Sequence, residues 1–302
     1  MATTTDTPPP SIPTTFCGLD LAHPVVNGSG TFDAIAAQAV FGDSFLDQFP
    51  FAAFVSKTIT LAVRDGNPPP RLWETPSGMI NSIGLPNKGL AGYLEHDLPK
   101  LAALPVPLIT NVMGSTAAEL CELVAACDAQ DAIRAIELNV SCPNVKTGLD
   151  IGADPVSLAE VLRAVRPQTT KPLIVKLTPN TADVALVAAA AEAEGADAVA
   201  LVNTLRATAQ APGGDGRPWL GGVTGGMSGP AIRAVALAQV TAVAQRVAIP
   251  VIGMGGIQRG EHAAQFLRAG ATLVAVGTES FRDPAAGTRI ARELQRLLAQ
   301  TA

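Results

Sequence analysis

The segment IELNVSCPN, residues 136–144, carries the residue types best suited to chemistry in this chain. It starts with the apolar alternation of a buried strand and then presents Cys142 between Asn139 and Asn144. A thiol with a pKa of about 8.5 can act as a base or a nucleophile once it is deprotonated. Amides beside a buried thiol need hydrogen-bonding partners, so the segment indicates a polar ligand. The alternative is that Cys142 is only a small buried hydrophobic residue.

Short β-branched runs alternate with Ala- and Leu-rich segments along the chain, which is typical of βαβ units and a parallel sheet. We predict eight strands, at residues 24–28, 52–58, 107–112, 135–141, 173–178, 198–204, 250–256 and 273–278. The intervening helices are predicted at residues 34–48, 88–103, 116–128, 155–166, 181–194, 229–247, 259–269 and 284–299.

Polar residues at the strand ends favour a (β/α)8 TIM barrel over the alternative, an open doubly wound sheet. Six predicted strands in succession end on polar side chains, at Asn27, Lys57, Asn111, Asn139, Lys176 and Asn203. One such residue could simply terminate a strand. In a barrel, however, the carboxyl ends of all strands meet at one mouth, where active sites lie. We therefore expect an α/β fold with a single barrel domain at residues 16–302, preceded by a flexible Thr/Pro-rich tail at residues 1–15.

Glycine-rich turns follow the last two predicted strands. GMGGI spans residues 253–257 and VGT spans residues 276–278. Barrels often bind phosphate between the loops after strands seven and eight, where glycine lets backbone N–H groups approach the oxygens. The earlier GSGTFD segment, residues 28–33, lacks the third glycine of a dinucleotide fingerprint.

Composition excludes several function classes. The 302 residues have a formal net charge of -5, and no basic cluster suggests binding to nucleic acid or to an anionic membrane. Four cysteines without CxxC spacing and three histidines give no framework for a metal site. No apolar run is long enough to span a membrane, and the N-terminus lacks the features of a signal peptide. The few cysteines fit a reducing cytoplasm.

Several motifs together resemble class 1 dihydroorotate dehydrogenases, the flavin barrels of pyrimidine biosynthesis, from about Gly18 to Phe281. The sequences NVKTG, GGMSGP and GMGGI are most similar to those of the catalytic subunit of subgroup B. The motifs are SKTIT, GNPPPRLWETPSGMINSIGLPNKG, ELNVSCPNVKTG, VKLTPN, VNT, GGMSGPAIR and IGMGGIQ.

The resemblance implies oxidation of dihydroorotate to orotate with FMN, with Cys142 as the catalytic base. The residues implied around FMN are Ser29, Lys57, Thr58, Asn111, Asn139, Lys176, Val202, Gly229, Gly255, Gly256, Gly277 and Thr278. The residues implied around the substrate are Lys57, Asn81, Ser82, Ile83, Gly84, Leu85, Asn139, Asn144, Asn203 and Thr204. Thr204 stands where the family often has serine, and residues 206–220 depart from the family pattern.

The electron acceptor follows from the subgroup. Subgroup B implies a homodimer flanked by electron-transfer subunits that carry FAD and a 2Fe–2S cluster and reduce NAD⁺, giving a heterotetramer. Subgroup A would use fumarate instead. Two other hypotheses are a related flavin barrel that acts on reduced uracil or thymine, which tends to carry histidine at the position of Asn144, and a barrel without enzymatic activity.

Overall fold

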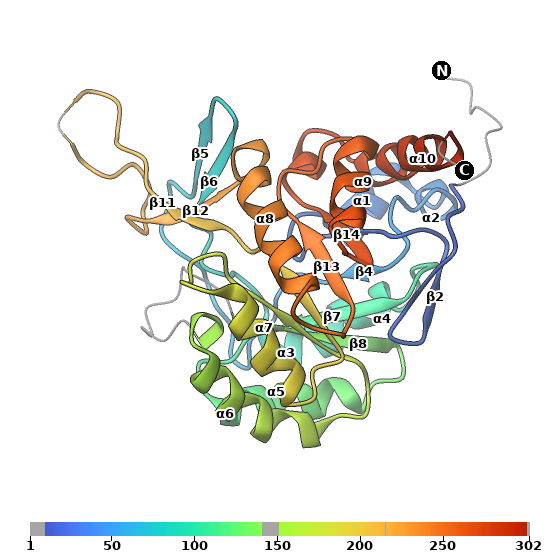
Figure 1. Cartoon of the computed structure of the whole chain (residues 1–302). Helices are drawn as coiled ribbons and strands as arrows, with labels where there is room; N and C mark the ends of the chain where they lie inside the picture. The colour runs from blue at the N-terminus through green and yellow to red at the C-terminus, as the bar shows by residue number, and fades with distance from the viewer. Residues whose placement is uncertain (1–9, 141–150, 215, 301–302) are drawn as a thin grey trace.

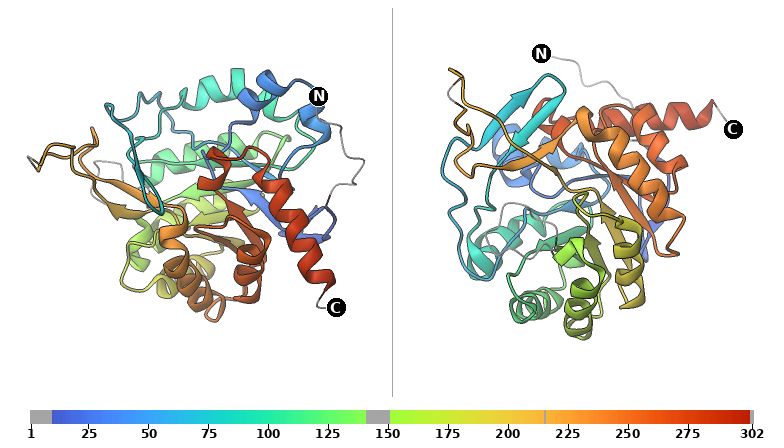
Figure 2. Two further views of the ribbon diagram at one scale, coloured as in Figure 1. Left: turned by 90° about the horizontal axis from the view of Figure 1, so that it is seen from above. Right: turned by 60° about the vertical axis from the view of Figure 1, so that its left-hand side comes forward.

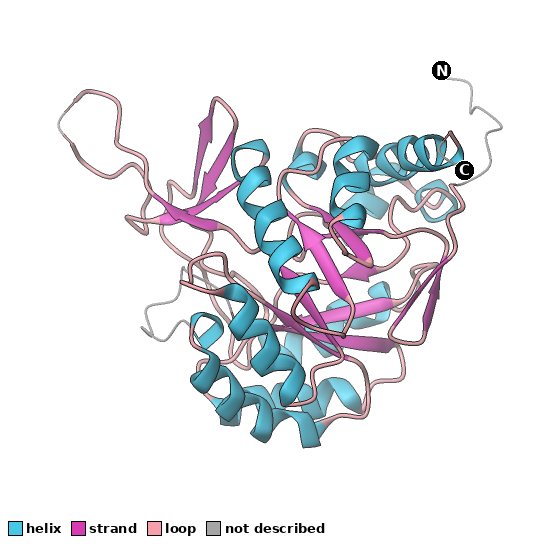
Figure 3. Ribbon diagram, in the orientation of Figure 1, coloured by secondary structure: helices cyan, strands magenta, loops and turns pink. Residues whose placement is uncertain are grey.

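The computed structural model describes residues 10–140, 151–214 and 216–300, and its centre is a sheet of eight parallel strands. The strands follow one another around the sheet in the order β3, β14, β13, β10, β9, β8, β7, β4, with helices packed outside them (Figures 1 and 3). They are β3 (Val25–Asn27), β4 (Phe54–Val55), β7 (Leu108–Val112), β8 (Ile133–Asn139), β9 (Leu173–Lys176), β10 (Ala198–Leu201), β13 (Val251–Met254) and β14 (Leu273–Val276). Each falls on one of the predicted ranges, which confirms the (β/α)8 barrel.

Helices alternate with the strands as predicted. The helices that match single predicted ranges are α5 (Ala117–Asp128), α6 (Pro155–Val165), α7 (Val184–Ala193), α8 (Arg233–Ala244), α9 (Gly260–Arg268) and α10 (Ala286–Ala299). The two early ranges are broken, into α1 (Ala34–Phe41) and α2 (Ser44–Asp47), and into α3 (Gly89–Gly92), the π-helical η1 (Tyr93–Asp97) and α4 (Leu98–Leu101). Single 3₁₀ turns are η2 (Ile151–Ala153), η3 (Arg166–Gln168), η4 (Pro230–Ile232) and η5 (Thr278–Phe281).

Alternation of side chains along each strand separates two apolar layers. Small and branched side chains fill the barrel interior, namely Val26, Ala53, Val55, Ile109, Ala135, Ile174, Ala198, Ala200, Ile252, Leu273 and Ala275. Their neighbours pack outward against the helices, among them Val25, Ile136, Leu138, Val175, Val199 and Val274. Because the interior is filled, space for a ligand must lie at the mouth of the barrel.

Short polar side chains fix where several helices begin, and therefore how the preceding strand-end loops run. Each accepts a hydrogen bond from a backbone N–H of the first turn, as in Asp33 at α1, Thr116 at α5, Asp154 at α6 and Asp183 at α7.

Asn27 joins the two ends of the barrel sheet. Within the described residues, no backbone ladder pairs β3 with β4, although Ala52 N, two residues before β4, donates to Val25 O at 3.0 Å. The Asn27 side chain takes the place of a peptide group there, because its Nδ2 donates to Val55 O at 2.8 Å and its Oδ1 accepts from Val55 N at 2.8 Å. Val26 points into the interior, so Asn27 points away from it and is fully buried. The prediction that Asn27, as one of six polar strand ends, faces the mouth of the barrel is therefore wrong.

A second sheet, which the sequence did not predict, covers one side of the barrel mouth (Figure 1, upper left; Figure 2). It is antiparallel, in the order β11 (Leu205–Ala207), β12 (Gly225–Ser228), β6 (Gly78–Asn81) and β5 (Leu72–Thr75). The rings of Trp73 and Trp219 pack edge to face, 5.4 Å apart, over buried Ile80 and Leu220. The segment at residues 206–220, which departs from the family pattern, thus begins in β11, and its Ala209, Trp219 and Leu220 pack on this sheet.

A hairpin of β1 (Thr14–Phe16) and β2 (Leu19–Leu21) closes the opposite end of the barrel. Buried Phe16, Leu19 and Leu21 join the apolar cluster of the barrel interior. The boundary of the tail at residue 15 stays a prediction, although β1 already begins at Thr14. Across the described residues, we find no helix with the length and apolar character that a membrane crossing requires.

Replacing Asn27 with Ala should lower the free energy of unfolding by about 2–4 kcal/mol, because the buried N–H and C=O of Val55 both lose their partner. Chemical denaturation monitored by fluorescence would measure this. The control is Thr15→Ala, which removes an exposed hydrogen bond to Asp20 and should change stability by less than about 0.5 kcal/mol. Equal stability of the two variants would contradict the role of Asn27 in closing the barrel.

Candidate active site

A cavity of about 770 Å³ lies at the carboxyl ends of the barrel strands, beneath the second sheet. This volume is in the range of small-molecule sites. Of the predicted site residues that the structure describes, all except Ser82 line it: Ser29, Lys57, Thr58, Asn81, Ile83, Gly84, Leu85, Asn111, Asn139, Lys176, Val202, Asn203, Thr204, Gly229, Gly255, Gly256, Gly277 and Thr278. The barrel therefore brings together groups that are far apart in the sequence.

Three predicted residues stand apart from this set. Ser82 is buried outside the cavity wall, where its hydroxyl donates to Thr224 O at 2.8 Å and accepts from Asn67 Nδ2 at 3.0 Å. Its assignment to the substrate stays a prediction. Cys142 and Asn144 lie outside the described residues, so their assignments stay predictions as well.

Hydroxyl and amide groups link three strand ends on one wall. Ser29 Oγ donates to Ser56 O at 2.8 Å and lies 3.3 Å from Thr58 Oγ1. Asn139 Nδ2 donates to that same Thr58 oxygen at 3.2 Å. These bonds join the loops after β3 and β4 to the end of β8, and they fix the polar wall without a ligand.

Asn111 lines the cavity and has an unpaired buried acceptor. Its Nδ2 donates to the buried carboxylate of Glu137 at 2.5 Å, and its buried Oδ1 has no hydrogen-bond partner. Because Glu137 Oε1 accepts the N–H of this amide, the amide oxygen is directed away from that bond. An unsatisfied buried acceptor costs about 1–3 kcal/mol, so a ligand N–H would relieve a real penalty here. Sequence reasoning missed Glu137, although a carboxylate within an apolar strand is itself a signal.

Two lysines bring positive charge to the cavity. Lys57 is open to the cavity, yet the surrounding protein desolvates its ammonium and lowers its pKa, against the opposing charge of Asp33. Lys176, at the end of β9, is only 6% exposed. In the part of the chain that the structure describes, neither has a carboxylate at ion-pair distance. Both are placed to meet an anionic or electron-rich ligand.

The loops after β13 and β14 form a cradle of glycines with the segment that follows β12. Gly256 has φ of 69°, and a Cβ there would lie 2.8 Å from Gly229 O, so only glycine fits. Thr278 Oγ1 donates to Ser228 Oγ at 2.9 Å and closes the cradle. Backbone N–H groups between these two strands are a common phosphate site in barrels. Gly229, which lies nine residues after the segment that departs from the family pattern, is thus beside Gly256.

Asn87 fixes the loop that supplies Ile83, Gly84 and Leu85 to the cavity. Its Nδ2 donates to Leu85 O at 2.9 Å, and its Oδ1 accepts from Gly89 N at 2.8 Å. Leu85 can therefore hold its left-handed φ of 57°.

The donor set fits a ligand with a phosphate at one end and a flat ring bearing N–H and C=O groups at the other, as FMN has. The unpaired Asn111 Oδ1, the glycine cradle and the two ammonium groups are the observations behind this fit. Among the described residues, no group of His, Cys, Asp or Glu side chains could hold a metal ion.

Several cavity residues were missed from the sequence. Gln258 and Glu279 line the wall directly after the two glycine motifs, and Trp73 does so from the second sheet. Their positions directly after the glycine motifs could have identified Gln258 and Glu279 from the sequence. Trp73 lies within the long quoted motif, but without the second sheet its side chain could not be placed.

Comparison with known proteins agrees with the geometry. A family model described as dihydroorotate dehydrogenase matches residues 11–298. A protein of Citrifermentans bemidjiense named dihydroorotate dehydrogenase B (NAD(+)), catalytic subunit, is 46% identical over 290 residues, covering 96% of this chain and 93% of its own length. A protein of Geobacter sp. with the same name is 45% identical, covering 96% and 94%. A Solibacter usitatus protein provisionally named dihydroorotate dehydrogenase A (fumarate) is 44% identical, with the same coverage of 96% and 94%. The chain belongs to the dihydroorotate dehydrogenase family.

Proposed function

We propose that this chain oxidises (S)-dihydroorotate to orotate with FMN, in the de novo route to UMP in the cytoplasm. The observation that carries the proposal is the cavity at the barrel mouth, in which two lysines, several asparagines and a glycine cradle meet. Family membership gives the substrate class, and the donor set of the cavity supports it independently.

We assign the cofactor to the side of the cavity between β13, β14 and the strand ends of β7 to β9. The glycine cradle with Gly255, Gly256, Gly277 and Thr278 would hold the phosphate. When bound, FMN supplies the two-electron acceptor that takes a hydride from C6 of the substrate. Asn111 would accept a ring N–H, and Lys176 would place a positive charge beside the ring. The remaining proposed contacts are Ser29, Lys57, Thr58, Asn139, Val202 and Gly229.

We assign the substrate to the side that faces the second sheet. Dihydroorotate and orotate carry ring amides and one carboxylate, and Asn side chains match amide edges because each can donate and accept. Asn81, Asn139 and Asn203 line this cavity, and Asn144 is proposed to join them. Lys57 would meet the carboxylate. Thr204 keeps the hydroxyl that serine often provides in the family.

We propose Cys142 as the base that removes the proton from C5 while the hydride leaves C6. A thiolate is formed more readily than an alkoxide, which suits proton abstraction near neutral pH. The Cys142 sulfur then holds the proton until solvent or a neighbouring group accepts it.

We propose NAD⁺ as the final acceptor, reached through a partner subunit with FAD and a 2Fe–2S cluster in a heterotetramer around a homodimer. The names of the relatives from Citrifermentans bemidjiense and Geobacter sp. support this assignment. The name of the Solibacter usitatus relative supports fumarate instead, so the acceptor needs a direct test.

Replacing Cys142 with Ala should lower dihydroorotate oxidation by about 10²–10⁴-fold and leave FMN content unchanged, because only the base is lost. Stopped-flow reduction of the bound flavin would measure the rate. Cys121→Ala is the matched control, since Cys121 lies in α5 outside the cavity. A Cys142→Ala variant with near-normal turnover at neutral pH would exclude this base.

Replacing Lys57 with Ala should weaken orotate binding by about tenfold or more, because the substrate carboxylate loses a charged partner. Titration of orotate against flavin absorbance gives the dissociation constant. Lys100→Ala, at an exposed position of α4, should bind orotate normally. If both variants bind orotate equally well, the proposed substrate pocket is wrong; turnover of dihydrouracil would instead favour the related flavin barrels.

The isolated chain should contain one FMN per protomer and no iron, and it should reduce artificial dyes but not NAD⁺ at a useful rate. The reason is that the proposed FAD and 2Fe–2S cluster belong to the partner subunit. Metal analysis and NADH formation with and without the co-purified partner would test this. Fast NADH formation by the iron-free chain alone would overturn the subgroup B assignment, and fumarate reduction would favour subgroup A.

A further inference from the structure

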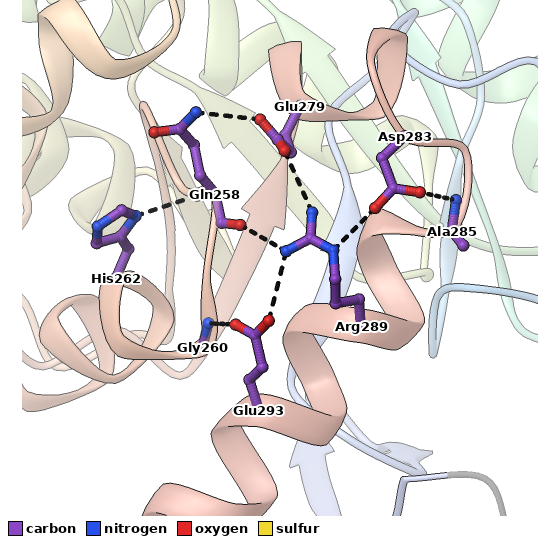
Figure 4. Close-up of polar contacts among 8 residues, drawn as sticks. All are labelled: Gln258, Gly260, His262, Glu279, Asp283, Ala285, Arg289 and Glu293. Atoms are coloured by element: carbon purple, nitrogen blue, oxygen red, sulfur yellow. Dashed lines mark hydrogen bonds and ion pairs between the residues drawn. The ribbon is translucent and has the colours of Figure 1, made fainter.

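Arg289 of α10 lies behind the loops that follow β13 and β14, outside the cavity wall (Figure 4). Its Nη1 donates to Gln258 O at 2.9 Å, in the loop after β13. Its Nη2 donates to the Glu279 carboxylate at 3.2 Å, in the turn after β14. Its Nε donates to Asp283 at 2.9 Å. One guanidinium thus links both loops of the glycine cradle to helix α10.

The two loops are also joined to each other and to α9. Gln258 Nε2 donates to Glu279 Oε2 at 3.2 Å across the gap between them. Glu293, one turn after Arg289, accepts from Gly260 N at 2.7 Å and so holds the start of α9. A Cβ on Gly260 would lie 2.4 Å from Leu294 N, which shows how closely α9 and α10 approach. The helix that carries Arg289 is therefore held in place against α9.

The residues that Arg289 holds are the ones next to the cradle. Gln258 follows Gly255 and Gly256 after one intervening residue, and Glu279 directly follows Thr278. Both Gln258 and Glu279 line the cavity. The spacing of the cradle thus depends on contacts that the cradle glycines, having no side chains, cannot make themselves.

The positive charge of Arg289 also changes the electrostatics at the glycine cradle. Glu279 lines the cavity beside the cradle, and its negative charge would repel a phosphate dianion bound there. Arg289 is the counter-ion of Glu279 at 3.2 Å. Burial lowers the pKa of Arg289, but Asp283, Glu293 and Glu279 raise it above its ordinary value, so the guanidinium stays charged.

We propose that Arg289 is a positioning residue for the phosphate of FMN: it does not touch the cofactor, but it sets the separation of the two loops and neutralises Glu279. The inference rests on the proposed function, because it concerns the FMN that the chain is proposed to bind. It also makes a distinct claim, namely that Arg289 affects the phosphate end of the cofactor and not its ring.

The test compares FMN with riboflavin, which has the same ring but no phosphate. Apoprotein of the full chain carrying Arg289→Gln should bind FMN at least about tenfold more weakly than the unmodified chain, as expected when a charged group loses its partner. Riboflavin binding should stay within about twofold. Quenching of flavin fluorescence gives both dissociation constants on one preparation, without any measurement of turnover.

Arg163→Gln is the matched control, since Arg163 also bonds a carboxylate, that of Glu194 at 2.8 Å, but on the outside of α6. It should leave both constants unchanged. Arg289→Lys serves if the glutamine variant does not fold, because lysine keeps the charge but not the fork that reaches both loops; it too should weaken FMN selectively.

Equal weakening of FMN and riboflavin, or of neither, would overturn the role of Arg289 while leaving the proposed function intact. If the unmodified apoprotein bound neither flavin, the proposed function would be contradicted and this inference with it.

Discussion

The hydrogen-bonded pair between Asn27 and Val55 is the interaction on which the arrangement of the site depends. Eight parallel strands form a barrel only if the first meets the second, and here a side-chain amide adds two hydrogen bonds beside the backbone bond from Ala52 N to Val25 O, where a backbone ladder joins the strands elsewhere. Closure brings the carboxyl ends of all the strands to one mouth. Lys57, Asn111 and Lys176, distant in sequence, then face one cavity. If the sheet opened at this seam, the same residues would line an edge and not a pocket.

The strands and helices of the barrel were predictable because their signals are local. Apolar period, β-branched runs and helix-starting side chains each act within a few residues. The polar side chains at the strand ends were predicted in part, since five of the six line the cavity and Asn27 does not. Successive side chains of a strand point to opposite faces, so a position at a strand end does not say which face it serves. Only the placement of Val26 in the interior settles the direction of Asn27.

The second sheet could not be predicted, because its pairing is not local. Asn81 in β6 pairs with Gly226 in β12, and neither β12, with two glycines in four residues, nor the proline-rich approach to β5 resembles a strand in sequence. Yet this sheet places Asn81 and Trp73 over the cavity. The family resemblance supplied residue identities that composition and periodicity could not, and the sheet gives the physical reason why they belong together.

Residues that line the cavity and residues directly behind them differ in whether their polar groups have hydrogen-bonding or ion-pair partners. Asn111 Oδ1 is buried without a partner, and Lys57 is desolvated without a carboxylate at ion-pair distance among the described residues, so both carry a cost in the free chain. Behind the cradle, Arg289 bonds to Gln258, Glu279 and Asp283. Arg289 thus has its hydrogen-bonding partners before a ligand arrives, while within the described part of the chain Asn111 Oδ1 and Lys57 do not. Binding of a ligand with a phosphate and ring N–H groups would satisfy these two groups, and it would stabilise the fold by mass action. The same unpaired groups therefore reduce the stability of the free chain and give the cavity its selectivity.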